Sequence, residues 1–279
     1  MPRITLCAPD SEKSCFACCP PIRPKGYEHI DYRNIIRRIL RENTRAFDPS
    51  SKEIIPITGF SCWALGYVDD RYRQVGCLLH PARNRGKDLR YRVDYGQKCQ
   101  RESCLGARRF MALSPSARLF WLGLAEGLDS FEYSSRRYNP LFRLLEWGVG
   151  LLEKIASTEK GNRVNSKTFF ERYPFFLTHL MPRAHTYLVD SLVQHCGLAP
   201  LRDKEFVPRF EAFCTRLIRK LPSVTSSPTA PYTHCLDMDE TLADFLRLAL
   251  GMKKIEKGEA LIIKQKVDQE MEAFIDQLP

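Results

Sequence analysis

The sequence predicts a mainly α protein, in which an irregular cysteine-rich metal-binding N-terminal module, residues 1–110, is followed by an all-α helical domain, residues 111–279. Eight of the eleven cysteines fall in the first 104 residues. Apolar residues repeat at helical spacing over long stretches only after Cys104. With 279 residues, 44% of them hydrophobic, the chain is long enough to bury one large core or two ordinary ones.

The N-terminal module contains few predicted elements. Asp31–Asn43 has apolar residues at helical spacing with arginines between them, which predicts a short amphipathic helix. Glu53–Thr58 and Tyr67–Leu79 are short β-prone segments interrupted by turn residues. The rest of the module is expected to be loop-rich and to lack a core of its own.

The C-terminal domain is predicted to be a series of helices. Ser114 is a good N-cap, and Pro115 suits the first turn of a helix that continues over 117–128. Asp237 and Glu240 resemble a capping box before a helix at 242–250, which Gly251 ends. A Ser/Thr/Pro-rich linker near 221–235 is expected to separate the final two helices. The other predicted helices are 138–157 (or 140–157), 166–172, 174–180, 183–196, 207–221 and 257–276.

The cysteines of the N-terminal module come in tight groups that suit metal binding. Cys15 and Cys18 form a C-x-x-C turn, which is short enough to bring two sulfurs to within about 2.3 Å of one ion. Cys19 follows directly, and because neighbouring side chains point apart in extended chain, we expect Cys18 and Cys19 to serve different ions. His80 is a further candidate ligand; the alternative is a histidine that orders the turn before Pro81. The candidate metal ligands are Cys7, Cys15, Cys18, Cys19, Cys62, Cys77, Cys99, Cys104 and His80.

Eight thiols suit two four-sulfur sites. These are two zinc ions, one or two iron–sulfur clusters, or one cluster and one zinc, and the sequence does not choose among them. Disulfides are the alternative, but the N-terminus lacks the regions of a signal peptide, and no stretch approaches the roughly 18 apolar residues of a spanning helix. We therefore expect a cytoplasmic protein with no membrane segment, in which reduced thiols favour metal over disulfides.

The basic excess of the chain lies in the same module. Residues 1–110 carry 21 Lys and Arg against 12 Asp and Glu, while residues 111–279 carry 22 against 21. One interpretation is a phosphate-binding face for nucleic acid, made by Arg83, Arg85, Lys87, Arg90 and Arg92. The other is neutralisation of the thiolates by nearby arginines, and the absence of a recognised binding module favours it. The sequence identifies no partner, and a protein partner stays open.

The cysteine pattern resembles that of a known family. Cys15-x-x-Cys18-Cys19, then Cys62, then Val75-Gly-Cys77-Leu-Leu-His80-Pro81, and then Cys99 are similar to the YkgJ-like zinc- or iron-chelating proteins over about residues 7 to 104. The chain differs in the displaced Cys7 and in His80-Pro81, where Tyr and Arg-Pro are more usual. The resemblance implies a thiolate metal centre without an assigned reaction.

Three functional hypotheses follow. In the first, zinc or an iron–sulfur cluster holds the module together. In the second, the cluster is catalytic and the helices form a substrate pocket; some flagellin lysine methylases have a similar cysteine cluster, which implies a protein methyltransferase, although no Gly-rich nucleotide loop supports it. The third is a nucleic-acid-binding zinc protein. Whether the chain is an enzyme stays open, since the nucleophile-elbow, H-E-x-x-H and P-loop motifs are absent.

Overall fold

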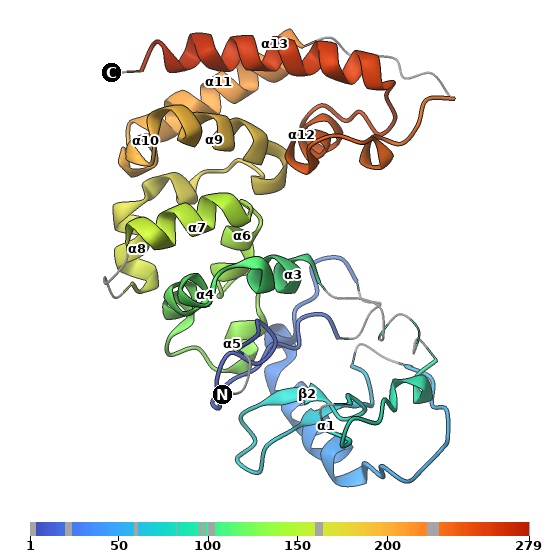
Figure 1. The fold of residues 1–279 in the computed structure, drawn as a ribbon. Coiled ribbons are helices and arrows are strands. Elements are labelled where there is room, and N and C mark those ends of the chain that lie inside the picture. Colours follow the sequence, from blue (N-terminus) through green and yellow to red (C-terminus); the bar gives the residue numbers. More distant parts are fainter. Residues whose placement is uncertain are drawn as a thin grey trace. The chain divides into compact units, whose positions relative to one another are not determined.

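The chain is mainly helical, as the sequence predicted, and it folds into two compact units, Met1–Phe142 and Arg143–Pro279 (Figure 1). The division falls later than residue 110, because the backbone N–H groups of Ser14 and Phe16 donate to the side chains of Ser130 and Ser134. The structure, a computed structural model, describes residues 4–19, 24–58, 61–81, 83–94, 97, 99, 104–159, 164–221 and 229–278.

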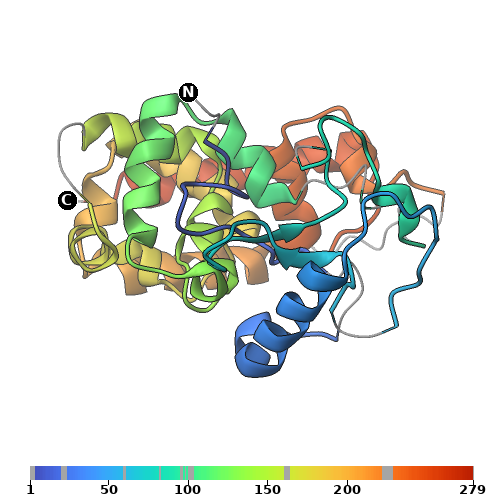
Figure 2. The same ribbon diagram turned by 90° about the horizontal axis from the view of Figure 1, so that it is seen from below.

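Unit 1 is built on one helix and one β-ribbon. The helix α1 (Arg33–Ala46) follows a 3₁₀ turn (His29–Tyr32) and lies alongside the antiparallel strands β1 (Leu65–Tyr67) and β2 (Val75–Cys77) (Figures 1 and 2). The predicted helix is therefore confirmed. The second predicted β segment is a hairpin, whereas in the first only Ile55 forms a bridge, to Val93.

Side chains of α1 hold the ribbon. The Asn43 amide donates to the carbonyl oxygens of Leu65 at 2.8 Å and Cys62 at 3.2 Å. The hydroxyl of Thr44 accepts from the Tyr67 N–H at 2.7 Å. A Cβ at Gly66 would lie 2.7 Å from this hydroxyl oxygen, so the close approach of strand and helix requires glycine there.

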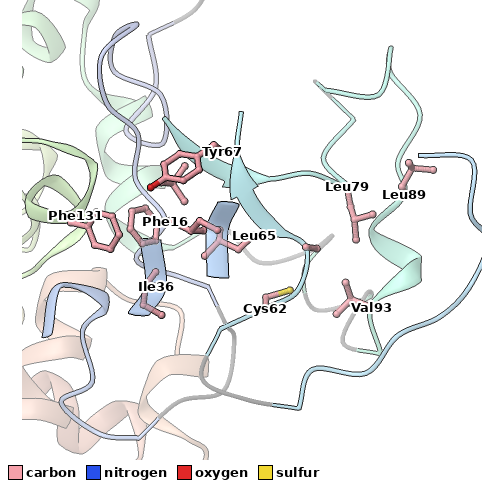
Figure 3. Close-up of a cluster of buried hydrophobic side chains, with 12 residues drawn as sticks. Phe16, Ile36, Cys62, Leu65, Tyr67, Leu79, Leu89, Val93 and Phe131 are labelled. Carbon is pink, nitrogen blue, oxygen red and sulfur yellow. The ribbon is translucent and has the colours of Figure 1, made fainter. Parts of the chain in front are cut away.

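Unit 1 has a hydrophobic cluster of its own. In Figure 3 Cys62 lies within this cluster, between Leu65 and Val93. The expectation that the cysteine-rich segment lacks a core is therefore wrong, since apolar residues of α1, the ribbon and the following loops bury one another. The buried members are Phe16, Ile36, Leu40, Cys62, Ala64, Leu65, Tyr67, Val75, Leu79, Leu89, Val93 and Phe131.

Later in unit 1 the described residues also form α3 (Leu105–Ala112), α4 (Pro115–Leu122) and α5 (Ser130–Ser134). Ser114 caps α4 and Pro115 stands in its first turn, as predicted. Besides the two serine bonds of α5, the Tyr133 hydroxyl donates to the Leu6 carbonyl at 3.0 Å. The N-terminal segment thus lies against α5 without regular structure of its own.

Unit 2 is all-helical in the residues described. The predicted helix over 138–157 is wrong in its continuity, because Gly148 takes φ +94° and separates α6 (Leu141–Leu145) from α7. The cap of α12 is also placed differently: Asp239, not Asp237, accepts the first N–H groups. The remaining elements are α7 (Val149–Thr158), α8 (Ser166–Arg172), a 3₁₀ turn (Pro174–Leu177), α9 (Pro182–Cys196), α10 (Ala199–Arg202), α11 (Phe206–Lys220), α12 (Glu240–Asp244), a π-helical turn (Phe245–Ala249) and α13 (Lys257–Ile275).

The last helix belongs to the core of unit 2. Phe274 of α13 stacks on Phe213 of α11 with ring centroids 4.3 Å apart. Of the expected linker, residues 222–228 lie outside the described residues, while buried Thr233 bonds to the Met252 carbonyl at 2.5 Å. None of the helices in the described ranges is long and apolar enough to cross a bilayer.

Candidate metal centre

Four cysteines, Cys7, Cys15, Cys18 and Cys104, form what we call the first thiol set. The Cys15 N–H donates to the Cys7 carbonyl at 3.0 Å. Burial raises the pKa of the Cys15 thiol, and the charges of Cys18, Cys7 and Cys104 raise it further. Cys7 is exposed as a residue, yet burial of its sulfur, followed by the charges of Cys18 and Cys104, raises its pKa to about 11. The charges of Cys18 and Cys104 thus act on both Cys7 and Cys15.

The second thiol set is Cys19, Cys62, Cys77 and Cys99. Strand pairing of Leu65 with Cys77, and the bond from the Leu65 N–H to the Cys62 carbonyl, bring Cys62 and Cys77 together. Burial raises the pKa of Cys62 to about 12, and the charges of Cys77 and Cys99 add to it. Burial and the charge of Cys99 raise the pKa of Cys77 to about 11. Three of the four thiols therefore come from the turn before β1 (Cys62), the end of β2 (Cys77) and the chain after the hairpin (Cys99).

Cys18 and Cys19 connect the two sets. A hydrogen bond between their side chains is the largest cause that raises the pKa of Cys19, ahead of burial and the charges of Cys18, Cys77 and Cys62. Cys19 thus faces the hairpin thiols, while Cys18 acts on Cys15 and Cys7. The two neighbours remain in side-chain contact although they belong to different sets.

Backbone N–H groups are directed at several of the sulfurs. A hydrogen bond from the main chain favours the thiolate over the thiol and so lowers the thiol pKa. Such donors also orient thiolates that bind metal and, in iron–sulfur clusters, shift the reduction potential. The donors are Ala17 to Cys15, Ala64 and Leu65 to Cys62, Leu79 and His80 to Cys77, and Ala107 to Cys104 at 3.3 Å.

A positive charge accompanies the second thiol set. The guanidinium of Arg90 donates to the Cys99 carbonyl at 2.9 Å and lowers the pKa of the Cys77 thiol. Asp88 fixes it with two hydrogen bonds of 2.8 and 2.9 Å. Partial burial and the charge of Arg90 lower the pKa of His80, while Asp88 raises it. The His80 imidazole therefore lies beside the Asp88–Arg90 pair.

Two supporting residues were missed in the sequence. Buried His29 contacts the Cys19 carbonyl through Nε2, and its ring lies 4.9 Å from that of Phe16. The buried Tyr133 hydroxyl anchors the start of the N-terminal segment. Neither residue carried a signal in the sequence, because the carbonyl groups that they contact belong to another segment of the chain.

The described residues hold no group of three or more Cys, His, Asp or Glu side chains in a geometry that could hold a metal ion. The structure describes all eleven cysteines, and none forms a disulfide. The two thiol sets are therefore defined by the charge effects between their members and not by a coordinating geometry. The donor type fits zinc or an iron–sulfur cluster, since four thiolates are the usual ligands of both.

The other candidate residues are used within the protein. Arg83 donates to the Val68 carbonyl at 2.7 Å, and buried Arg92 donates to the Asp48 carbonyl at 2.8 Å. With Arg90, three of the five residues predicted to meet phosphate are thus bonded to the chain itself. Arg85 and Lys87 are exposed.

The comparisons with known proteins add no relative: the chain matches no protein-family model, and no curated protein or solved structure is significantly similar to it. The resemblance to YkgJ-like proteins stays a prediction from the cysteine pattern. The function has to be argued from the thiol sets themselves.

Proposed function

We propose that unit 1 is a metal-binding module in which each thiol set holds one zinc ion or one iron–sulfur cluster. The observation that carries this proposal is that the hairpin brings Cys62 beside Cys77. The charge effects among the other thiols, which come from segments far apart in the chain, support a grouping of the eight into two sets of four. Four sulfurs complete a tetrahedral zinc site or the ligand shell of a cluster. In this proposal His80 does not bind metal and instead orders the turn after Cys77.

The surroundings of the thiols support the proposal. Four thiolates around a divalent ion leave a net charge of about −2, which needs hydrogen-bond donors and positive charge nearby. The main-chain donors at Cys62 and Cys77 and the fixed guanidinium of Arg90 supply both. In the absence of metal, burial keeps these thiols protonated. Metal binding should therefore release protons and bring the sulfurs of each set closer together.

Metal analysis of single variants tests the proposal. Protein prepared without oxygen should contain metal in a fixed ratio to the chain. Cys15→Ser (first set) and Cys77→Ser (second set) should each lose about half of it, because a tetrahedral site does not survive the loss of one thiolate. Cys235→Ser is the matched control: this exposed thiol lies in unit 2 and should not affect metal content.

The visible spectrum decides between the two kinds of centre. Thiolate-to-iron absorption identifies clusters, and a colourless protein with bound zinc identifies zinc sites. A chain that carries no metal when prepared in this way, or a Cys235→Ser variant that loses as much metal as Cys77→Ser, would contradict the proposal.

A further inference from the structure

The outer face of α1 is a row of arginines. Asn34, Arg38, Arg41 and Arg45 recur at helical spacing, and Arg38 to Arg45 span about 10 Å along the axis. With Arg37 and Glu42 they line a shallow hollow of about 460 Å³. The opposite face, with Ile36 and Leu40, packs on the core. The helix is therefore held by its apolar side and leaves its arginines in water.

Few acidic groups offset these arginines. Glu42 lies 3.7 Å from Arg38, but both side chains are well exposed, at 63% and 73%, where an ion pair is weak. Asp129 lies 3.7 Å from Arg37. Among the described residues, Arg41 and Arg45 have no carboxylate within ion-pair distance. The row thus keeps a net positive charge.

A second hollow adjoins the first and has a different character. It measures about 480 Å³ and shares Arg37 with the arginine row. It is lined by Tyr67, Tyr72 and Phe131, and its carboxylates Asp10, Glu12 and Asp129 are paired with the cations Lys13, Arg73 and Arg37. Aromatic residues suit a flat base, and paired charges of both signs suit its hydrogen-bond donors and acceptors.

Tyr72 stands between the two hollows in a fixed, uncommon conformation. Its φ is +55°, which a bulky residue rarely adopts. The Asp69 carboxylate holds the turn by accepting the N–H groups of Arg73 at 3.0 Å and Gln74 at 2.7 Å. The ring is 45% exposed, has Tyr67 edge-on at 5.1 Å and lies 5.9 Å from the Arg41 guanidinium. The hairpin turn thus presents an aromatic ring at the end of the arginine row.

We propose that single-stranded nucleic acid binds across this surface, with a base against Tyr72 in the second hollow and phosphates along Arg38, Arg41 and Arg45. Only a strand with unstacked bases reaches both hollows, because a duplex keeps its bases inside and offers the protein mainly backbone and groove edges. An anionic lipid surface could meet the arginine row but has no base to place against Tyr72, so the aromatic ring beside the row favours nucleic acid. None of the described residues that line the two hollows is a member of either thiol set, and none lies within Arg83–Arg92.

Binding of fluorescent single-stranded RNA and DNA of about 16 nucleotides, the upper end of known site sizes, tests the proposal on the full, metal-loaded chain. Replacing Arg38, Arg41 and Arg45 together by Gln should reduce the slope of log K against log salt by about 2, since each phosphate contact contributes about 0.7 on single strands. The same change at exposed Arg209, Arg216 and Arg219 of α11 removes equal charge and should leave the slope unchanged.

Variants of Tyr72 test the contact of a base with its ring. Tyr72→Ala should weaken binding about 5- to 100-fold, whereas Tyr72→Phe, which keeps the ring, should bind normally. Metal content and circular dichroism of each variant show whether unit 1 is intact. The proposal is overturned by absence of binding, by equal losses in the α11 control, by tighter binding to a blunt duplex, or by preference for phosphatidylserine vesicles over oligonucleotide.

Discussion

Arg92 shows how a single basic residue serves the fold rather than a ligand. It is 2% exposed, and its guanidinium lies 5.8 and 5.4 Å from the rings of Phe47 and Trp63. Its Nη1 donates to the Asp48 carbonyl at 2.8 Å, and its Nε faces the Glu53 carbonyl at 3.4 Å. One planar cation thus ties the loop after α1 to the turn at 90–92.

Arg92→Lys should lower the free energy of unfolding of unit 1 by about 1.5–3 kcal/mol, the usual contribution of hydrogen bonds to a charged group. Lysine keeps the charge but loses the planar fork and the stacking. Denaturant titration measures the change. Arg45→Lys, at an exposed position of α1, is the control and should change the midpoint little; similar losses in both variants would contradict the role assigned to Arg92.

His185 on α9 should make the stability of unit 2 depend on pH. Burial lowers the pKa of His185 below its ordinary 6.5, although the Met181 carbonyl 2.9 Å from Nδ1 partly offsets this. The folded state therefore binds fewer protons than the unfolded state. Stability from this residue is complete above about pH 6.5 and is lost as the pH falls through the folded pKa, at no more than about 1.4 kcal/mol per pH unit.

Denaturant midpoints between about pH 7.5 and pH 5 measure this dependence. His185→Gln cannot take up the proton, so its midpoint should fall less with decreasing pH than that of the unchanged protein. His195→Gln is the matched control: His195 lies on the same helix and contacts the Ser191 carbonyl at 2.8 Å, but it is exposed. A pH dependence that is unchanged in His185→Gln would show that another group causes it.

At the scale of elements, the break between α6 and α7 depends on one glycine. Gly148 has φ +94° and ψ 159°, a region that residues with a Cβ hardly enter. Gly148→Ala should therefore cost about 1–3 kcal/mol of stability. The space itself is sufficient, because the nearest atom to an added Cβ, Thr186 Cγ2, lies 3.4 Å away.

Gly150→Ala, two residues along the chain, should have the opposite effect on stability. Gly150 is inside α7, has no positive φ, and an added Cβ would meet nothing within 4 Å. Alanine there should stabilise the protein by about 0.5–1 kcal/mol. Thermal unfolding of the two variants compares them directly, and a loss in both would mean that the backbone angle of Gly148 is not the cause.

Elements with local signals could be predicted from sequence, and contacts between distant segments could not. The predicted helix Ser166–Arg172 is confirmed. Its cap is local: the side chain of Asn165 accepts the N–H of Thr168, only three residues along the chain. The periodicity of apolar residues likewise predicted α1. It could not predict the break at Gly148, because the apolar repeat continues through a residue whose φ is positive. Local spacing identified the cysteines as candidate ligands.

The sequence suggested two sites of four thiols but not which cysteines share a set. That membership depends on the β1–β2 register and on Cys104, the N-cap of α3, whose charge acts on Cys7 and Cys15. The arginine row of α1 was visible in sequence as recurrences at i+3 and i+4. Its meaning depends on the neighbouring turn at Tyr72, which only the fold brings close.

At the scale of the whole molecule, the two units are stabilised differently. Unit 2 buries a continuous aromatic core, in which Trp147, Phe175 and Phe210 follow one another at centroid distances of 5.3 and 5.7 Å. Unit 1 has a smaller cluster together with long irregular segments held by side-chain bonds. Metal bound at the thiol sets would therefore contribute to unit 1 only.

Chelation under reducing conditions should consequently loosen unit 1 in part. We expect faster hydrogen exchange in 4–19 and 61–81, which carry most of the thiols, and little change in α7 to α13. A metal whose free concentration is about 100 times its dissociation constant adds about 2.7 kcal/mol to the free energy of unfolding. Its removal should therefore lower protection from hydrogen exchange about 100-fold where opening exposes the thiols. The core face of α1 should keep part of its protection, because Ile36 and Leu40 pack on the hydrophobic cluster whether or not metal is bound. Exchange measured by mass spectrometry distinguishes the outcomes: an equal increase over both units, or none in unit 1, would contradict a stabilising metal in unit 1.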